Sequence, residues 1–320
     1  MCTIFQCKQN ISLAYAKSLS ISMTTVFDEI PESILIKILE KLELIDRLVI
    51  RKTSKKFRTT VDNLINIKII RITVKNNFSR ISLDNYEFEY DNVGDHCIVA
   101  YGNISRNING VDHKNFAFGD LNMILNMSKL ELKELQIIII CGLLGERESF
   151  MDIFENLDSI HSRKCTIEGF NSLEISRILS FFKAGVLEEI DLCSLNSICK
   201  NKEIIELEQW KKALKLVSRS HVIQVENLLS FKEFEVYETA MTKRRAVKIR
   251  DVLTTSTSLE TGTFEFASFF NLNQIATVFN PTFNMDNFVN STCIDFTNNG
   301  GSNFLIHLGP RCLKIEKNLK

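Results

Sequence analysis

Three stretches of the chain share one spacing of apolar residues. In each stretch, a second apolar residue follows the first after three positions, and a third follows after two more. The three sets are Leu132, Leu135 and Ile137; Leu187, Ile190 and Leu192; and Phe231, Phe234 and Val236. The first set runs directly into β-branched residues that end at Ile140. Such runs favour strands, and a strand of a parallel sheet can carry them because it has little contact with water. A recurring spacing of this kind indicates a repeated structural unit.

Amphipathic stretches alternate with these strands. Helical spacing of apolar residues is found in residues 149–162, 172–185, 202–218 and 242–256, and a shorter helix is expected around residues 120–126. Further strands are expected at residues 164–170 and 263–269. Gly185 suits the position that ends a helix. Because parallel strands need a connection that returns the chain, the pattern predicts an irregular α/β solenoid with repeats longer than leucine-rich repeats. An ordinary α/β sheet without repeats is the alternative.

Two antiparallel regions are expected on either side of this solenoid. Residues 66–110 alternate apolar and polar positions in short runs, which predicts a small antiparallel β meander. Near the C-terminus, Asn299-Gly300 separates two alternating runs, which predicts a β-hairpin. This hairpin is expected to close the open end of the parallel stack. The fold class predicted for the whole chain is α+β.

The region before the meander has a helical pattern. Pro31 suits the first position of a helix, because its ring fixes φ and its missing N–H has no partner there. Asp46 and Ser54 are placed to cap two further helices. Three helices within about forty residues bury little core of their own, so a partner surface is expected here.

The same region resembles an F-box. That family opens on a Leu-Pro pair, continues through paired aliphatic residues, and ends in an Arg-x-x-Ser/Cys-Lys-x-Trp/Leu-Arg segment. The matching residues are Ile30, Pro31, Ile34, Leu35, Ile38, Leu39, Leu42, Leu48, Arg51, Ser54, Lys55, Phe57 and Arg58. Ile30 departs from the usual leucine, and Thr53 replaces a common valine and is expected to place a hydroxyl near the core. A plain helical bundle packed on the rest of the chain is the alternative.

The F-box resemblance implies a partner and a set of contact residues. It implies that the segment binds the Skp-type adaptor of an SCF-type ubiquitin ligase and, through it, a cullin. The residues assigned to this contact are Ile30, Pro31, Ile34, Leu35, Ile38, Leu39, Leu42 and Leu48.

A second resemblance lies in residues 207–213, LEQWKKA. This stretch is similar to the signature helix of the FTH domain, which follows the F-box in the nematode F-box A family. The resemblance implies a non-catalytic substrate-recognition adaptor in which residues 120–320 bind a target protein whose identity is not implied. The alternative is an F-box scaffold that binds a partner, for example a translation or RNA regulator, without causing its degradation.

Composition and charge restrict the other classes of function. Basic and acidic residues both total 39 among 320 residues, so no net charge attracts nucleic acid or membranes. The nine cysteines contain no Cys-x-x-Cys pair, which fits a reducing compartment, cytoplasmic or nuclear or both, and no metal site. No nucleotide-binding glycine pattern or nucleophile motif is found, so neither an enzyme nor a cofactor is expected.

The predicted organisation has four parts. These are residues 1–24, an N-terminal extension expected to be disordered; 25–66, the F-box; 67–119, the β meander and connector; and 120–320, the FTH-like repeat region. Lys17 interrupts the weakly apolar N-terminal stretch, so a signal peptide is not expected. The sequence leaves open whether Met1 or Met23 is the functional start.

Overall fold

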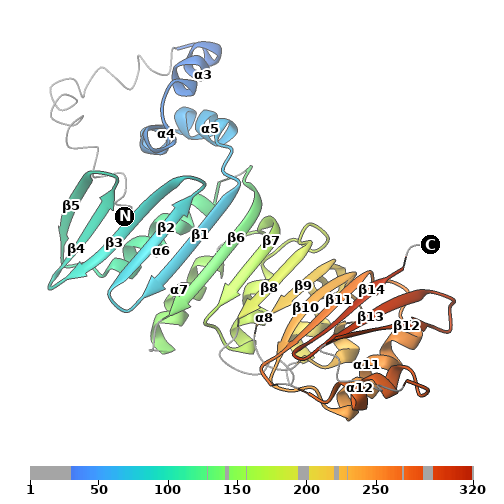
Figure 1. The fold of residues 1–320 in the computed structure, drawn as a ribbon. Coiled ribbons are helices and arrows are strands. Elements are labelled where there is room, and N and C mark those ends of the chain that lie inside the picture. Colours follow the sequence, from blue (N-terminus) through green and yellow to red (C-terminus); the bar gives the residue numbers. More distant parts are fainter. Residues whose placement is uncertain are drawn as a thin grey trace. The chain divides into compact units, whose positions relative to one another are not determined.

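The chain divides into two compact units, Met1–His161 and Ser162–Lys320. Figure 1 shows the ribbon with its helices and strands labelled. The structure is a computed structural model, and it describes residues 30–127, 129–140, 144–155, 157–193, 202–219, 223–228, 230–268, 270–283 and 291–318. The expected N-terminal extension, residues 1–24, lies outside the described residues.

The first unit begins with three short helices. These are α3 (Glu32–Glu40), α4 (Leu44–Ile50) and α5 (Lys55–Leu64). Ser54 caps α5 as predicted, because its hydroxyl accepts a hydrogen bond from the Phe57 N–H at 3.2 Å. The cap predicted at Asp46 is wrong: α4 begins two residues earlier, with Glu43 at the cap position and Asp46 inside the first turn. Pro31 precedes the first helical residue of α3.

A sheet follows the three helices. Its antiparallel strands are β1 (Ile69–Lys75), β2 (Phe78–Leu83), β3 (Tyr86–Val93), β4 (His96–Tyr101) and β5 (Ile104–Asn109), each paired with the next. β6 (Glu131–Ile140) pairs parallel with β1, so the strand order is β6-β1-β2-β3-β4-β5. Gly94 and Gly102 form tight turns with φ of 60° and 54°, a backbone conformation that glycine adopts without steric cost.

The helix α6 (His113–Leu125) packs on this sheet against β2 and β3, and α7 (Leu144–Glu155) packs beside it. Two buried hydrogen bonds join α6 to the strands, from Ser79 to His113 at 2.8 Å and from Tyr90 to Asp120 at 2.9 Å. The helix starts before the predicted residue 120, because Asp112 caps it by accepting from the Lys114 N–H. The boundary expected between residues 119 and 120 therefore falls inside a helix whose core face belongs to the first unit.

The second unit is built on parallel strands that end in an antiparallel group. The parallel strands are β7 (His161–Glu168), β8 (Glu189–Cys193), β9 (Lys215–Ser218), β10 (Glu233–Glu238) and β11 (Thr261–Phe266). The antiparallel strands are β12 (Thr292–Thr297), β13 (Asn303–Gly309) and β14 (Cys312–Lys317). The strand order in this unit is β12-β13-β14-β11-β10-β9-β8-β7.

Helices connect the strands of this second unit. They are α8 (Ser172–Ser180), α9 (Lys202–Glu206), α10 (Glu208–Lys212), the 3₁₀ helix η2 (Val225–Leu228), α11 (Lys243–Thr255) and α12 (Leu272–Phe279). α8 ends five residues before Gly185, which lies in a later turn with φ of 83°. The predicted helix 202–218 is broken, because its last residues complete the sheet as β9 between β8 and β10. Tertiary pairing here overrides the local helical pattern.

In the first and third sets, the apolar spacing corresponds to a bulge where a strand begins. In β6, the N–H groups of Lys133 and Glu134 both bond to the Lys68 carbonyl, at 2.7 and 3.1 Å. In β10, the N–H groups of Lys232 and Glu233 share the Leu214 carbonyl in the same way, at 2.8 and 3.1 Å. Two residues opposite one partner define a β-bulge, and the extra residue explains a step of three before the alternation of two. All nine apolar residues of the three sets are buried.

Some of the parallel strands are less shielded than the sequence suggested. Helices pack on one face of each unit's sheet (Figure 1). Burial alternates along β6 and β10, whereas β7, β8 and β9 each contain three consecutive buried residues. Ile140, the last of the consecutive isoleucines, is 53% exposed. The β-branched run in β6 therefore reflects strand propensity and one buried face, and the expectation of little contact with water is wrong for this strand.

The predicted C-terminal hairpin is present as β12 and β13. The Asn298 side chain accepts from the Ser302 N–H at 2.8 Å, and Gly301 has φ of 78°, so the turn extends beyond Asn299-Gly300. The sequence did not predict β14, which lies between the hairpin and the last parallel strand, β11.

Two glycines lead to opposite expectations for the same substitution. A Cβ on Gly262 would lie 2.4 Å from Cζ of Phe234, whose ring packs edge-on against Phe264 in the core. We expect Gly262→Ala to lower the free energy of unfolding by about 1–3 kcal/mol, because the ring must move. A Cβ on Gly119, within α6, meets no atom within 4 Å. Gly119→Ala is therefore expected to raise the free energy of unfolding by about 0.5–1 kcal/mol. Urea denaturation of both variants measures these changes, and equal shifts would contradict the packing described for Phe234.

Candidate functional site

The outer face of α3 exposes two large aliphatic side chains. Ile34 is 50% exposed and Ile38 is 48% exposed, and the two lie one helical turn apart. Pro31, one turn before Ile34, is exposed as well. Because exposed apolar side chains that adjoin one another mark interaction surfaces, these three residues form the candidate adaptor-binding face.

The remaining residues assigned to the adaptor contact have another role. Leu35 and Leu39 meet Phe57 and Val61 of α5 in a small core. Leu39 and Leu48 have no exposed surface, so neither can touch a partner while the helices stay folded. Leu39 therefore lies in the core of the three helices rather than on an exposed stripe of α3. Partly buried Ile30 and Leu42 pack against the same core.

Polar contacts hold the three helices in register. The Arg51 guanidinium donates to both carboxylate oxygens of buried Asp62, at 2.5 and 3.1 Å. Arg47 donates to the Leu42 carbonyl at 2.9 Å, which ties α4 to the end of α3. The Lys56 ammonium donates to the Ile30 carbonyl at 2.7 Å. These contacts fix the orientation of α3 and with it the candidate face.

Thr53 does not disturb this core. Its side chain is exposed, and its hydroxyl donates to the Ile50 carbonyl at 2.8 Å. The expectation of a hydroxyl near the core is wrong, because the residue lies in the turn between α4 and α5 and points to solvent.

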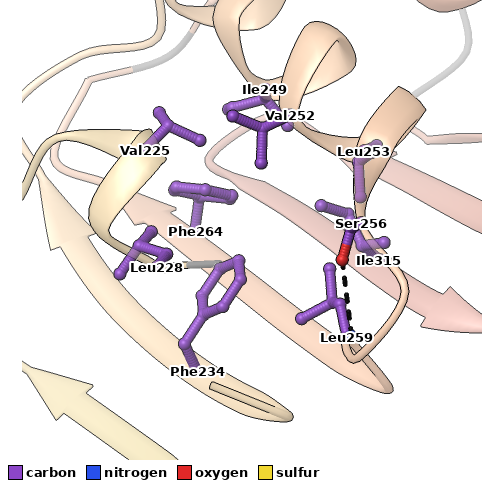
Figure 2. A pocket seen from close by; sticks show the side chains of 10 residues that line it. All are labelled: Val225, Leu228, Phe234, Ile249, Val252, Leu253, Ser256, Leu259, Phe264 and Ile315. Atoms are coloured by element: carbon purple, nitrogen blue, oxygen red, sulfur yellow. Dashed lines mark hydrogen bonds between the residues drawn. The ribbon is translucent and has the colours of Figure 1, made fainter. Parts of the chain in front are cut away.

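In the second unit, an apolar cavity lies between α11 and the sheet. Figure 2 shows Ile249, Val252 and Leu253 of α11 above Phe234 and Phe264 of the strands. The cavity has a volume of about 10 Å³. Its polar lining side chain, Ser256, already accepts a hydrogen bond from the Leu259 N–H at 3.4 Å (Figure 2). A space of this size holds one water molecule at most, so it is a packing defect rather than a ligand site.

The signature segment 207–213 is a structural element. Trp210 is 2% exposed, and its ring lies edge-on to Phe231 with the centroids 5.0 Å apart. Gln209 donates to the Phe182 carbonyl at 2.7 Å, which fastens α10 to the end of α8. Trp210 is therefore part of the core. Leu214, which falls within the predicted helix 202–218, is 46% exposed and directly precedes β9.

The open face of the second sheet, which faces away from the helices, carries rows of charged side chains. Lys164 pairs with Glu189 at 2.9 Å, and Arg219 pairs with Asp191 at 3.0 Å. Burial raises the pKa of the Asp191 carboxyl above its usual value, and the Arg219 charge opposes this shift. These pairs stabilise neighbouring strands.

Among the described residues, no group of three or more His, Cys, Asp or Glu side chains is arranged to hold a metal ion. Within the same described ranges, no helix combines the length and apolar character needed to cross a bilayer.

Comparison with known proteins agrees with both resemblances seen in the sequence. The F-box domain model matches residues 27–68, which include α3, α4 and α5, and the FTH domain model matches residues 146–282. A curated relative, F-box A protein 224 of Caenorhabditis elegans, is 24% identical over 306 residues, covering 90% of this chain and 78% of that protein. No solved structure matches the chain.

These matches carry a general functional meaning. An F-box domain implies a role as substrate adaptor of an SCF-type ubiquitin ligase, in which it generally binds the Skp-type adaptor and through it a cullin. F-box and FTH families are generally non-catalytic adaptors. With an F-box domain, an FTH domain and a relative that is named as an F-box A protein, the chain belongs to the nematode F-box A family.

Proposed function

We propose that this chain is a non-catalytic substrate-recognition subunit of an SCF-type ubiquitin ligase. In this role, the three-helix F-box binds the Skp-type adaptor, and the region after α6 binds a target protein. The observation that carries the proposal is the pair Ile34 and Ile38, exposed on α3 while the neighbouring leucines are buried. The F-box keeps its own core and still presents an apolar face to a partner.

The proposed contact set is narrower than the one expected from sequence. Pro31, Ile34 and Ile38 contact the adaptor directly, whereas Leu35, Leu39 and Leu48 support them from within the folded unit. Ile30 and Leu42 lie at the margin, half-buried against the core. An apolar anchor of this kind supplies most of the binding energy at a protein interface.

The region after α6 fits a target-binding role because it is built from repeated elements. Two of its strands, β6 and β10, begin with the same bulge, and helices connect its strands on one face. We propose that these elements form an irregular solenoid. Repeated units of this kind leave the opposite face of the sheet open as an extended surface. We propose that this adaptor acts in the cytoplasm, the nucleus or both.

Target stability separates this function from the scaffold alternative. Purification of the chain with its partners identifies a target candidate, and we expect proteasome inhibition to raise its level. Cells that express Ile34→Glu/Ile38→Glu should still contain the chain bound to the target, but with less ubiquitin on the target. The matched control is Lys37→Gln, which changes an exposed residue of the same helix. A target whose level and ubiquitination respond to neither treatment would favour the scaffold and contradict the ligase role.

A further inference from the structure

Three side chains with acid, base and nucleophile chemistry lie in a row on the C-terminal strands. Cys293 on β12 is directly opposite His307 on β13, and Glu316 lies on β14. The Cys293 Sγ is 3.1 Å from Nδ1 of His307, and Nε2 of His307 is 3.0 Å from Oε2 of Glu316. The histidine therefore links the thiol to the carboxylate through its two ring nitrogens.

The carboxylate decides the direction of both hydrogen bonds. The Lys314 ammonium, 2.6 Å from Glu316, and His307 together hold the pKa of the Glu316 carboxyl below its usual value, so the group is ionised. An ionised carboxylate only accepts hydrogen bonds, so Nε2 of His307 must carry the proton. In the neutral ring, Nδ1 is then an acceptor aimed at the thiol. Nδ1 of His307 can therefore accept the proton of the Cys293 thiol.

Exposure distinguishes Cys293 from the other cysteines that the structure describes. Cys97 and Cys165 are buried, and Cys193 and Cys312 are half-buried, whereas Cys293 is exposed. Burial raises the pKa of the thiol in all four of the others, to about 11 in Cys97. Thiolates rather than thiols attack electrophiles, so these four are the less reactive group.

We propose that Cys293 is a reactive thiol that forms mixed disulfides with small disulfide compounds, with His307 as its proton acceptor and Glu316 as the residue that orients His307. The Cys293 proton passes to Nδ1 of His307 while Sγ attacks one sulfur of the disulfide. A new S–S bond forms to Cys293, the original S–S bond breaks, and the departing thiolate takes the proton from His307. Cys293 is oxidised, the leaving sulfur is reduced by the same two electrons, and no further reactant is needed.

The surroundings of the three residues suit this chemistry. Asp295, Cys312 and Lys314 are the other titratable residues of the described C-terminal strands β12 to β14 on this face, and Lys314 is engaged with Glu316. The two nitrogens of His307 are occupied by the thiol and the carboxylate, so the ring serves proton transfer rather than metal binding. The proposal does not depend on the adaptor role, because β12 to β14 lie in the second unit and the F-box lies in the first.

The rate of reaction with oxidised glutathione tests the proposal in the full chain. Mass spectrometry after timed quenching resolves the modification at each cysteine. An unassisted thiol is only about 1% thiolate at about pH 6.5, so Cys193 and Cys312 provide slow internal references. We expect Cys293 to react about tenfold faster than either of them at that pH.

Variants of the base and of the orienting residue separate chemistry from packing. His307→Gln keeps a polar side chain of similar size but removes the base. It should slow the reaction of Cys293 with oxidised glutathione about tenfold at about pH 6.5 and far less at about pH 8.5. Glu316→Gln should slow the reaction by a smaller factor, and Cys312→Ser should leave Cys293 unchanged. Melting temperatures close to that of the unmodified chain verify folding. Two results at about pH 6.5 would overturn the proposal. In the first, Cys293 reacts in the unchanged chain within twofold of its rate in His307→Gln. In the second, Cys293 reacts no faster than Cys312.

Discussion

Replacing Ile34 and Ile38 with glutamate is expected to abolish binding of the Skp-type adaptor while the chain remains folded. Both side chains are about half exposed, so the folded chain can hold the new charges in water. In the complex, the same charges would lie in an apolar contact without partners, which costs several kcal/mol. A micromolar complex has only about 8 kcal/mol of binding free energy, so we expect the affinity to fall at least about 100-fold.

Two measurements on the purified variants check this expectation. Calorimetric titration with the adaptor gives the affinity, and a thermal melt shows whether the double variant keeps its fold. The control Lys37→Gln should bind like the unchanged chain, because Lys37 is exposed but polar. Undiminished binding of the double variant would show that the adaptor contacts another face.

Leu39→Arg is expected to abolish adaptor binding for a different reason. The Leu39 side chain is fully buried between α3 and α5, so an arginine there would place a charge in the F-box core. The resulting loss of several kcal/mol exceeds what three short helices can supply, and the F-box unfolds. Hydrogen exchange should show α3 and α5 losing protection while the strands of the second unit keep theirs. Retained protection in α3 would contradict the burial of Leu39.

Arg245→Ala is expected to lower the free energy of unfolding by about 3–5 kcal/mol. The Arg245 guanidinium donates to the Glu238 carboxylate and to the Ile223 carbonyl, the latter at 2.7 Å, and lies over the Phe264 ring. The side chains of Arg245 and Glu238 are 12% and 4% exposed. Removing the guanidinium leaves a buried carboxylate without its charge partner.

The pH dependence gives this prediction a second test. Burial raises the pKa of the Glu238 carboxyl above its usual value, and the Arg245 charge opposes that shift. Without Arg245, the folded protein should bind the Glu238 proton more tightly than the unfolded chain does. The stability of the variant is then lost as pH rises, so its deficit should be larger at about pH 7.5 than at about pH 4.5.

A control variant lies on the same helix. Lys248 forms an exposed pair with Glu226 at 2.9 Å, so Lys248→Ala should cost at most about 1 kcal/mol. Urea denaturation at the two pH values compares the variants. A pH-independent deficit in Arg245→Ala would contradict the role given to Glu238.

Sequence spacing predicted the repeated strands of this protein but not the geometry that produces the spacing. The step from Leu132 to Leu135 indicated a repeated unit without explaining the spacing, and the structure shows a bulge at Lys133 and Glu134. Residues 215–218 carry a helical pattern but form a strand, because one strand on each side, β8 and β10, supplies backbone hydrogen-bond partners. Strand pairing between distant segments decides the secondary structure of such residues, and the local spacing of apolar residues does not reveal that pairing.

The candidate adaptor-binding face is a second feature that local sequence spacing could not predict in full. Ile34, Leu35, Ile38 and Leu39 are equally apolar, so the sequence alone placed all four in one contact set. The packing of α5 against one side of α3 divides them into a core pair and an exposed pair. A stripe of four aliphatic residues on one helix is compatible with either division until the position of the neighbouring helix is known.

The row of Cys293, His307 and Glu316 was missed, although part of its signal was present. A hairpin centred on Gly300 places Cys293 opposite His307, since each lies seven residues from the centre. Glu316 depends on β14, which the sequence did not predict. Cross-strand register therefore assembles a set of residues that linear spacing conceals.

Titration of the intact chain with the purified Skp-type adaptor tests the central claim most directly. We expect saturable binding of one adaptor per chain with a dissociation constant in the micromolar range or tighter, equivalent to about 8 kcal/mol or more. The absence of saturable binding at concentrations well above micromolar, from a chain whose thermal melt shows a folded F-box, would contradict the assignment of Ile34 and Ile38 to an adaptor-binding face.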